Sequence, residues 1–106
     1  MQPSDVAVCS IVRAELLHGA LGSRDPSKER AVVDTFLAPL ASLPFDDAAA
    51  DRYADIRHAL ERAGKTIGAH DLEIAAIALS RSLTVVTHNV DEFSRVTGLA
   101  WEDSQA

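Results

Sequence analysis

Residues 70–95, HDLEIAAIALSRSLTVVTHNVDEFSR, contain the two patterns that decide the fold. The first ten residues are apolar on nearly every side after the first turn, which predicts a helix over 70–79 buried on more than one face. The β-branched run Thr84–Thr87 predicts a strand, residues 88–89 a turn and residues 91–95 a single helical turn. A buried helix followed by a short buried strand is typical of a parallel sheet covered by helices.

The rest of the chain alternates strands and helices in the same way, with capping and breaking residues between them. Ser10 is expected to cap the first helix, Gly22 to end it and Pro39 to disturb the second one. Asp46 or Asp47 is expected to cap the third helix and Gly64 to end it. The expected elements are a strand over 6–9, helices over 11–21 and 27–41, an edge strand over 43–45, a helix over 49–63 and a last strand over 99–101.

The length and composition are those of one small soluble domain. The chain has 106 residues, of which 47% are hydrophobic and 25% charged. It contains no apolar run long enough to span a membrane and no signal-like start, so a soluble, cytoplasmic protein is expected. Its single cysteine, Cys9, allows no intrachain disulfide and fits a reducing compartment.

The net charge limits how the chain could meet a nucleic acid. Ten Lys and Arg residues against sixteen Asp and Glu residues give a formal charge of −6. The overall field would therefore repel a polyanion, which argues against a general nucleic-acid coat. A local site remains open, because a divalent metal held by carboxylates reverses the sign of the potential around it.

Three acidic residues are placed where they could act together: Glu15, Asp71 and Glu92. Taken singly, each is ordinary: a helix-surface glutamate, a first-turn aspartate and a solvated glutamate after a turn. However, ligands of parallel α/β sheets bind at the carboxyl ends of the strands, where all three are expected to converge. Converging carboxylates need a cation, and oxygen-only ligands suit Mg²⁺ or Mn²⁺. The chemistry this implies is metal-assisted phosphodiester cleavage.

The other polar residues near these acids give weaker signals. His70 and His88 each adjoin an element of the expected site and are candidates to line it or to touch substrate. Thr87 and Asn89 flank the turn after the strand and most often would satisfy local backbone groups only. The four histidines form no paired motif, so a zinc site is not favoured. Neither a phosphate-binding glycine loop nor a serine-hydrolase elbow is present.

Five segments form a specific combination of motifs that covers nearly the whole chain. They are SIVRAELLHGA (10–20), LPFD (43–46), ADRYADIR (50–57), IGAHDLEIAA (67–76) and TVVTHNVDEFSRV (84–96). In these motifs the sequence resembles the VapC toxins of the PIN-domain family.

The resemblance implies a single PIN-like domain over residues 1–106, an α/β fold with three α/β/α layers around a short parallel sheet. It also implies a toxin of a type II toxin–antitoxin system that cleaves RNA with Mg²⁺ or Mn²⁺. Glu15, Asp71 and Glu92 match the family's catalytic, metal-binding acids, while Thr87 and Asn89 match residues that line the site. A VapB-like antitoxin and RNA are the implied partners, and a homodimer remains open.

One family element has no counterpart. Family members begin with a central strand ending in Leu-Asp-Thr-Asn, whose Asp is a metal ligand, and residues 1–5 do not match it. The resemblance therefore implies that the first βα unit, roughly two dozen residues, is absent. The strand over 6–9 is then expected to pair directly with Thr84–Thr87, and the isolated chain to be poorly soluble.

An inactive PIN-domain remnant that only binds protein partners is the alternative, because the first Asp has no counterpart. A receiver-like phosphoacceptor domain is disfavoured, because its cluster of acids after the first strand is absent.

Overall fold

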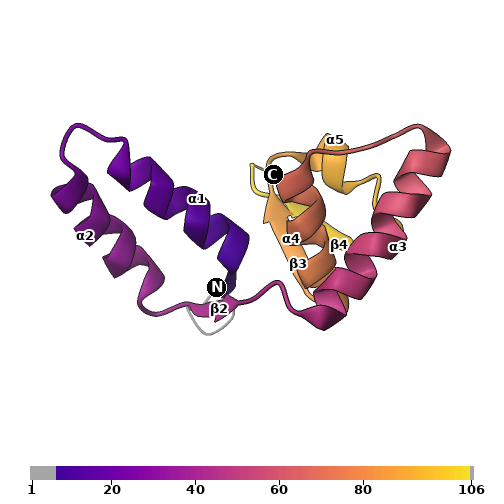
Figure 1. Cartoon of the computed structure of the whole chain (residues 1–106), viewed down its shortest axis with the longest axis horizontal. Coiled ribbons are helices and arrows are strands. Elements are labelled where there is room, and N and C mark those ends of the chain that lie inside the picture. The colour runs from indigo at the N-terminus through magenta and orange to yellow at the C-terminus, as the bar shows by residue number, and fades with distance from the viewer. Residues whose placement is uncertain (1–6, 106) are drawn as a thin grey trace. The chain divides into compact units, whose positions relative to one another are not determined.

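The computed structural model describes residues 7–105 and has an α/β fold with parallel strands (Figure 1). The chain divides into two compact units, residues 1–44 and 45–106, and each is described here by itself. Among the described residues, no helix is long and apolar enough to cross a membrane. The predicted α/β class with short parallel strands is confirmed.

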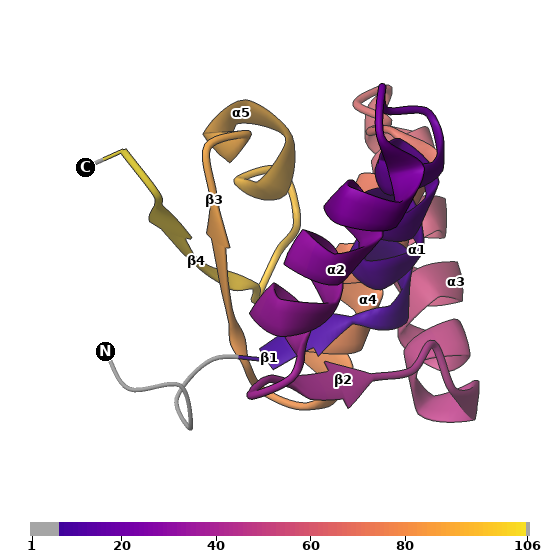
Figure 2. The same ribbon diagram turned by 90° about the vertical axis from the view of Figure 1, so that its left-hand side faces the viewer.

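The first unit is a strand–helix–helix–strand segment. Its elements are β1 (Ala7–Cys9), α1 (Ser10–Leu21), α2 (Pro26–Leu37) and β2 (Ala41–Leu43). β1 and β2 are parallel, with Ala7 opposite Ala41 and Cys9 opposite Leu43 (Figure 2). The Asp25 side chain accepts a hydrogen bond from the Lys28 amide at 3.2 Å, and Pro26 follows it with a pre-set φ, so α2 starts here.

The second unit contains α3 (Asp47–Ala63), α4 (Ala69–Ser80), β3 (Thr84–Thr87), α5 (Val90–Phe93) and β4 (Ala100–Asp103). β3 and β4 are parallel, with Thr84 opposite Ala100 and Thr87 opposite Asp103. Figure 2 shows β3 running up into the short helix α5, from which the chain returns to β4. This connection places α5 at the carboxyl end of β3.

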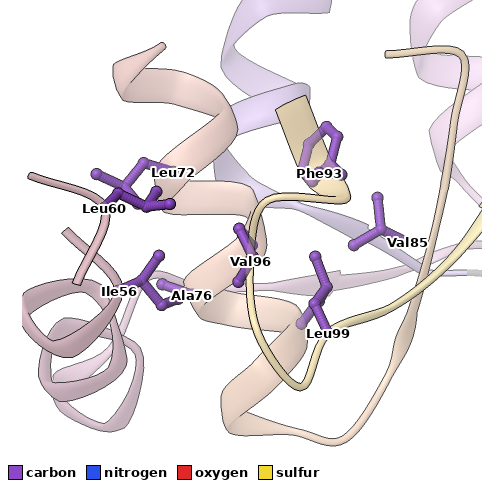
Figure 3. Packing of buried hydrophobic residues seen from close by; sticks show 10 residues of the cluster. Ile56, Leu60, Leu72, Ala76, Val85, Phe93, Val96 and Leu99 are labelled. Atoms are coloured by element: carbon purple, nitrogen blue, oxygen red, sulfur yellow. The ribbon is translucent and has the colours of Figure 1, made fainter. Parts of the chain in front are cut away.

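The core of the second unit joins α3, α4, β3 and the segment around α5 (Figure 3). Ala75 and Ala76 are fully buried, and Phe93 of α5 is only 2% exposed. Small residues on α4 allow α3 to pack closely, and the larger side chains fill the space beside them. The main members of the cluster are Ile56, Leu60, Leu72, Ala76, Val85, Phe93, Val96 and Leu99.

The capping predictions hold best for α3. The Asp46 side chain accepts a hydrogen bond from the Ala49 amide at 2.9 Å, and Gly64 ends the helix in the left-handed conformation with φ of 68°. Ser10, in contrast, is the first residue of α1 and not its cap, because β1 runs directly into the helix at Cys9. Val6 of the predicted first strand lies outside the described residues.

Three elements have boundaries that differ from the predicted ones. The second helix ends at Leu37 and not near residue 41, because Pro39 removes an amide that a further turn would use. The edge strand lies at Ala41–Leu43 and not at 43–45, so it stops before Pro44. The last strand is Ala100–Asp103 and not 99–101, so it starts one residue later than predicted.

In the part of the chain that the structure describes, each strand pairs within its own unit, β1 with β2 and β3 with β4. The predicted pairing of the strand over 6–9 with Thr84–Thr87 would join the two units, so it stays a prediction. The expected poor solubility stays a prediction.

Candidate active site

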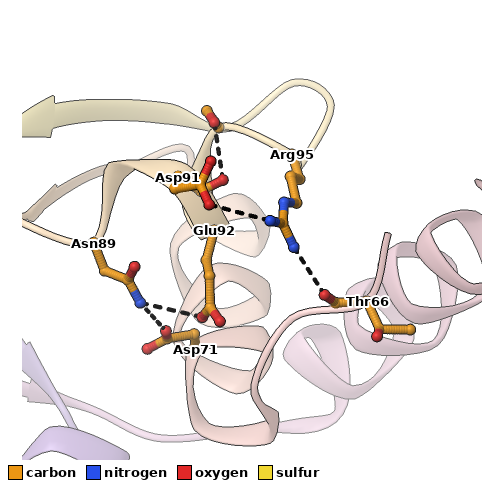
Figure 4. A network of polar contacts seen from close by, with 7 residues as sticks. Thr66, Asp71, Asn89, Asp91, Glu92 and Arg95 are labelled. Carbon is orange, nitrogen blue, oxygen red and sulfur yellow. Dashed lines mark hydrogen bonds and ion pairs between the residues drawn. The ribbon is translucent and has the colours of Figure 1, made fainter. Parts of the chain in front are cut away.

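Two acidic side chains meet beyond the carboxyl end of β3 (Figure 4). Asp71 lies in the first turn of α4, which begins after Gly68, and Glu92 lies on α5. The turn between β3 and α5 is shaped by the Thr87 hydroxyl, which accepts a hydrogen bond from the backbone amide of Asn89 at 2.9 Å. The start of one helix and the turn after one strand therefore bring Asp71 and Glu92 together.

Asn89 bridges the two carboxylates. Its Nδ2 donates to Asp71 Oδ2 at 2.7 Å and to Glu92 Oε2 at 3.1 Å. Figure 4 shows the two acidic side chains approaching this one amide group from different elements. We call Asp71 and Glu92 the carboxylate pair, and Asn89 orients both of its members.

The surroundings of Glu92 favour its ionised form. A side-chain hydrogen bond with Asp71 is the main cause that lowers the pKa of Glu92 from its ordinary value of 4.5. This pKa is lowered further by the Gly68 backbone amide, the Asn89 side-chain amide and the positive charge of Arg95. Partial burial of Glu92 acts in the opposite direction and raises the pKa. Glu92 is thus a carboxylate at neutral pH and is available to a cation.

A second set of contacts fastens α5 next to the pair. Arg95 donates from Nη2 to Asp91 Oδ2 at 3.1 Å and from Nη1 to the Thr66 carbonyl at 3.0 Å. Thr66 belongs to the segment between α3 and α4, so Arg95 joins two segments that lie far apart in the sequence. Figure 4 shows this guanidinium reaching across to Thr66.

The remaining predicted site residues are distributed as follows. His70 is exposed on α4 next to Asp71, and His88 is exposed in the turn after β3. Glu15 is exposed on α1 in the first unit, so its convergence with the carboxylate pair stays a prediction. The Thr87 hydroxyl shapes the turn, as the local interpretation of this residue predicts.

The donor set of the pair suits a hard divalent cation. Among residues 7–105, no group of three or more His, Cys, Asp or Glu side chains is assembled that could hold a metal. Mg²⁺, however, is commonly held by one or two carboxylates and completes its shell with water and substrate phosphate oxygens. Two neighbouring carboxylates with oxygen-only chemistry therefore fit Mg²⁺ or Mn²⁺ better than zinc.

Sequence reasoning missed two contributors to this arrangement. The Gly68 backbone amide lowers the pKa of Glu92, and Arg95 links α5 to Thr66. Arg95 lies within the segment that carries the family resemblance, but its partner is a backbone carbonyl 29 residues away. Every residue type has a backbone carbonyl, so the identity of residue 66 could not have predicted this contact.

The hydrogen bond from Asn89 gives a testable pH effect. In the metal-free protein, Asn89→Ala should raise the pKa of Glu92, because it removes a donor to the ionised form. The contacts of Glu92 stabilise the folded chain above pH 4.5, and this stabilisation is lost as the pH falls through the lowered pKa. NMR titration of the Glu92 side-chain carboxyl carbon measures the change, and an unchanged midpoint would contradict it.

A comparison with family models places this site in a known context. Residues 1–99 match the model of the PIN domain. The chain belongs to the PIN-domain family. The resemblance inferred from the motifs is thus confirmed, and the carboxylate pair is a feature of a PIN-domain chain.

Curated relatives of this PIN-domain chain are VapC proteins. It is 40% identical over 98 residues to the tRNA(fMet)-specific endonuclease VapC of Shigella flexneri, covering 92% of this chain and 74% of the relative. It is 39% identical over 98 residues to ribonuclease VapC2 of Haemophilus influenzae, with the same coverage of each chain.

Solved structures with the same PIN-domain fold come from toxin–antitoxin complexes. DNA-bound VapBC from Salmonella typhimurium matches with a TM-score of 0.88 and 41% identity, over 92% of this chain and 74% of that one. VapBC-1 from nontypeable Haemophilus influenzae matches with a TM-score of 0.91 and 32% identity, over 95% and 75% of the two chains.

Proposed function

We propose that this chain is a divalent-metal-dependent endoribonuclease that acts as the toxin of a toxin–antitoxin system. The observation that carries the proposal is the carboxylate pair, bridged by Asn89 at the carboxyl end of β3 in a PIN-domain chain. The names of its relatives, ribonuclease VapC and tRNA(fMet)-specific endonuclease VapC, support RNA as the substrate class.

In this proposal Asp71 and Glu92 hold Mg²⁺ or Mn²⁺, and Glu15 is the third acid that completes the set. The bound metal would activate water and stabilise the developing charge on the phosphate and leaving oxygen. Asn89 keeps the two carboxylates oriented toward a common point by donating to both. Thr87 holds the turn that presents Asn89. His70 and His88, the sequence neighbours of Asp71 and Asn89, are the candidate contacts to the RNA.

The proposed metal would also allow this acidic chain to bind RNA. A chain with a net charge of −6 repels RNA at a distance, and two neighbouring carboxylates add to this repulsion locally. A divalent cation on the pair replaces a negative site by one that attracts phosphate. RNA binding should therefore depend on the cation, and so should cleavage.

Cleavage of RNA by the purified chain tests this function. The chain should cleave RNA in Mg²⁺ or Mn²⁺, lose the activity in excess chelator and regain it when either cation is added back. Gel analysis of an end-labelled tRNA and of an unstructured RNA of equal length measures the rate and the preference. Cleavage that continues undiminished in chelator would contradict metal dependence, and no cleavage under any condition would favour the inactive remnant.

A VapB-like antitoxin is the proposed protein partner, because the solved neighbours are VapBC complexes. On α1 and α2, Leu21, Val32 and Phe36 are each more than half exposed. Exposed apolar side chains of this kind mark a contact surface for another protein. We propose that the antitoxin covers this surface, with a second copy of the chain as the competing occupant.

Phe36→Asp tests the partner surface. The variant should lose co-purification with the product of the adjacent gene, because it places a charge in an apolar contact. Leu83→Asp is the control, since Leu83 is an exposed apolar residue of the second unit. Equal recovery of the partner with both variants would contradict the surface, and a change in oligomeric state instead would assign it to a homodimer.

A further inference from the structure

Arg95 is the side chain that holds α5 against the segment preceding α4. Its two terminal nitrogens make separate contacts, at 3.0 Å to the Thr66 carbonyl and at 3.1 Å to the Asp91 carboxylate. The side chain of Arg95 is 33% exposed, whereas that of Asp91 is 89% exposed. Both contacts lie at the surface, and the contact to Thr66 spans 29 positions in the sequence.

The two segments that Arg95 joins carry the parts of the carboxylate pair. Glu92 lies on α5, which has only four residues and cannot be stable without tertiary contacts. Thr66 lies two residues before Gly68, which is adjacent to the Glu92 carboxylate, and five residues before Asp71. A change in the distance between Thr66 and α5 would therefore shift Glu92 relative to Asp71.

We propose that Arg95 is a positioning residue that sets the separation of Asp71 and Glu92 by fastening α5 to the backbone of Thr66. This inference rests on the proposed metal-dependent cleavage, since the separation of Asp71 and Glu92 matters when both hold one metal ion. Hard cations tolerate little error in ligand position, so a loosened Glu92 weakens metal binding. Arg95 itself touches neither metal nor RNA in this role.

The chemistry of arginine explains why this residue type is needed. Its planar guanidinium offers several donors in a fixed arrangement and can reach two acceptors at once. A lysine carries the same charge on a single nitrogen and would not hold both Thr66 and Asp91 in the same geometry. An exposed pair between residues four apart, such as Arg57 with Glu61, joins positions within one helix and fixes no second segment.

The experiment compares Arg95→Met and Arg95→Lys with the control Arg57→Met in the full chain. Arg57→Met removes a similar exposed ion pair from α3. We expect Arg95→Met to weaken binding of Mn²⁺ alone by about tenfold or more and to lower kcat for RNA similarly, with KM within about twofold. Arg95→Lys should recover part of the loss, and Arg57→Met should match the unsubstituted chain.

Hydrogen exchange at the Ser94 amide keeps the inference testable without any activity, because this amide donates to the Val90 carbonyl of α5 at 2.9 Å. In the metal-free protein, Arg95→Met should speed exchange at this amide by about tenfold, because α5 is then no longer fastened to Thr66. Arg57→Met should leave the rate unchanged, and circular dichroism confirms that each variant is folded. Unchanged Ser94 exchange in Arg95→Met overturns the positioning role whether or not the chain cleaves RNA.

The kinetic outcomes separate this inference from the proposed function. A higher KM with unchanged kcat in Arg95→Met would assign the residue to RNA binding and overturn the positioning role. Unchanged Mn²⁺ affinity and kcat would overturn it as well. An unsubstituted chain that neither binds Mn²⁺ nor cleaves RNA would refute the proposed function, while the exchange measurement would still decide whether Arg95 fastens α5.

Discussion

Asp71→Asn and Glu92→Gln should each lower the rate of RNA cleavage by about 10²–10³-fold. Each substitution removes one of the two neighbouring charges available to the metal and leaves the side-chain volume nearly unchanged. A metal contributes several kcal/mol of transition-state stabilisation, and about 1.4 kcal/mol corresponds to a tenfold change in rate. Glu15→Gln belongs to the same series, because Glu15 is the third acid of the proposed site.

Asp51→Asn is the matched control for this loss, since Asp51 is an exposed acid on α3. Single-turnover cleavage of end-labelled RNA measures the rates, and circular dichroism shows that the variants are folded. Full activity in both Asp71→Asn and Glu92→Gln would remove the carboxylate pair from the mechanism. A similar loss in Asp51→Asn would mean that the effect is one of net charge.

Phe93→Ala should lower the free energy of unfolding by about 3–5 kcal/mol, a large part of the ~5–15 kcal/mol typical of a domain. Phe93 is 2% exposed and packs in the core shared by α4, β3 and the segment after α5. It is the buried residue of α5, so its loss should also release Glu92 from its place beside Asp71.

Urea unfolding followed by circular dichroism measures this effect. Phe36→Ala is the control. Phe36 is 59% exposed, so this substitution should lower the free energy of unfolding far less than Phe93→Ala does. Activity should fall in Phe93→Ala even at temperatures where the variant remains folded. A loss of less than about 1 kcal/mol would contradict the core position of Phe93.

The sequence predicts the elements best where local chemistry decides them. α3 was predicted at both ends because Asp46 and Gly64 act through contacts within the chain segment itself. The helix α4 and the strand β3 follow from their apolar patterns alone. Strand pairing depends on how distant segments meet, which no local pattern records, so the pairing of β1 with β2 was not predicted.

The candidate site was predictable to a similar degree. Asp71 and Glu92 were expected to converge, and the structure brings them together because Asp71 lies at the start of the helix that leads into β3 and Glu92 follows β3. The bridge through Asn89 was not predicted, since it depends on the turn that the Thr87 hydroxyl stabilises. The role of Arg95 depends on a backbone acceptor and on the length of its own side chain, and neither is visible in residue spacing.

The central claim is that Asp71 and Glu92 together hold the divalent cation on which RNA cleavage depends. The most direct test is a titration of the purified chain with Mn²⁺, in which electron paramagnetic resonance reports the free ion. The account predicts saturable binding in the unsubstituted chain, loss of that binding in the Asp71→Asn, Glu92→Gln double variant, and loss of cleavage in parallel. Equal Mn²⁺ affinity in the unsubstituted chain and the double variant would contradict the account.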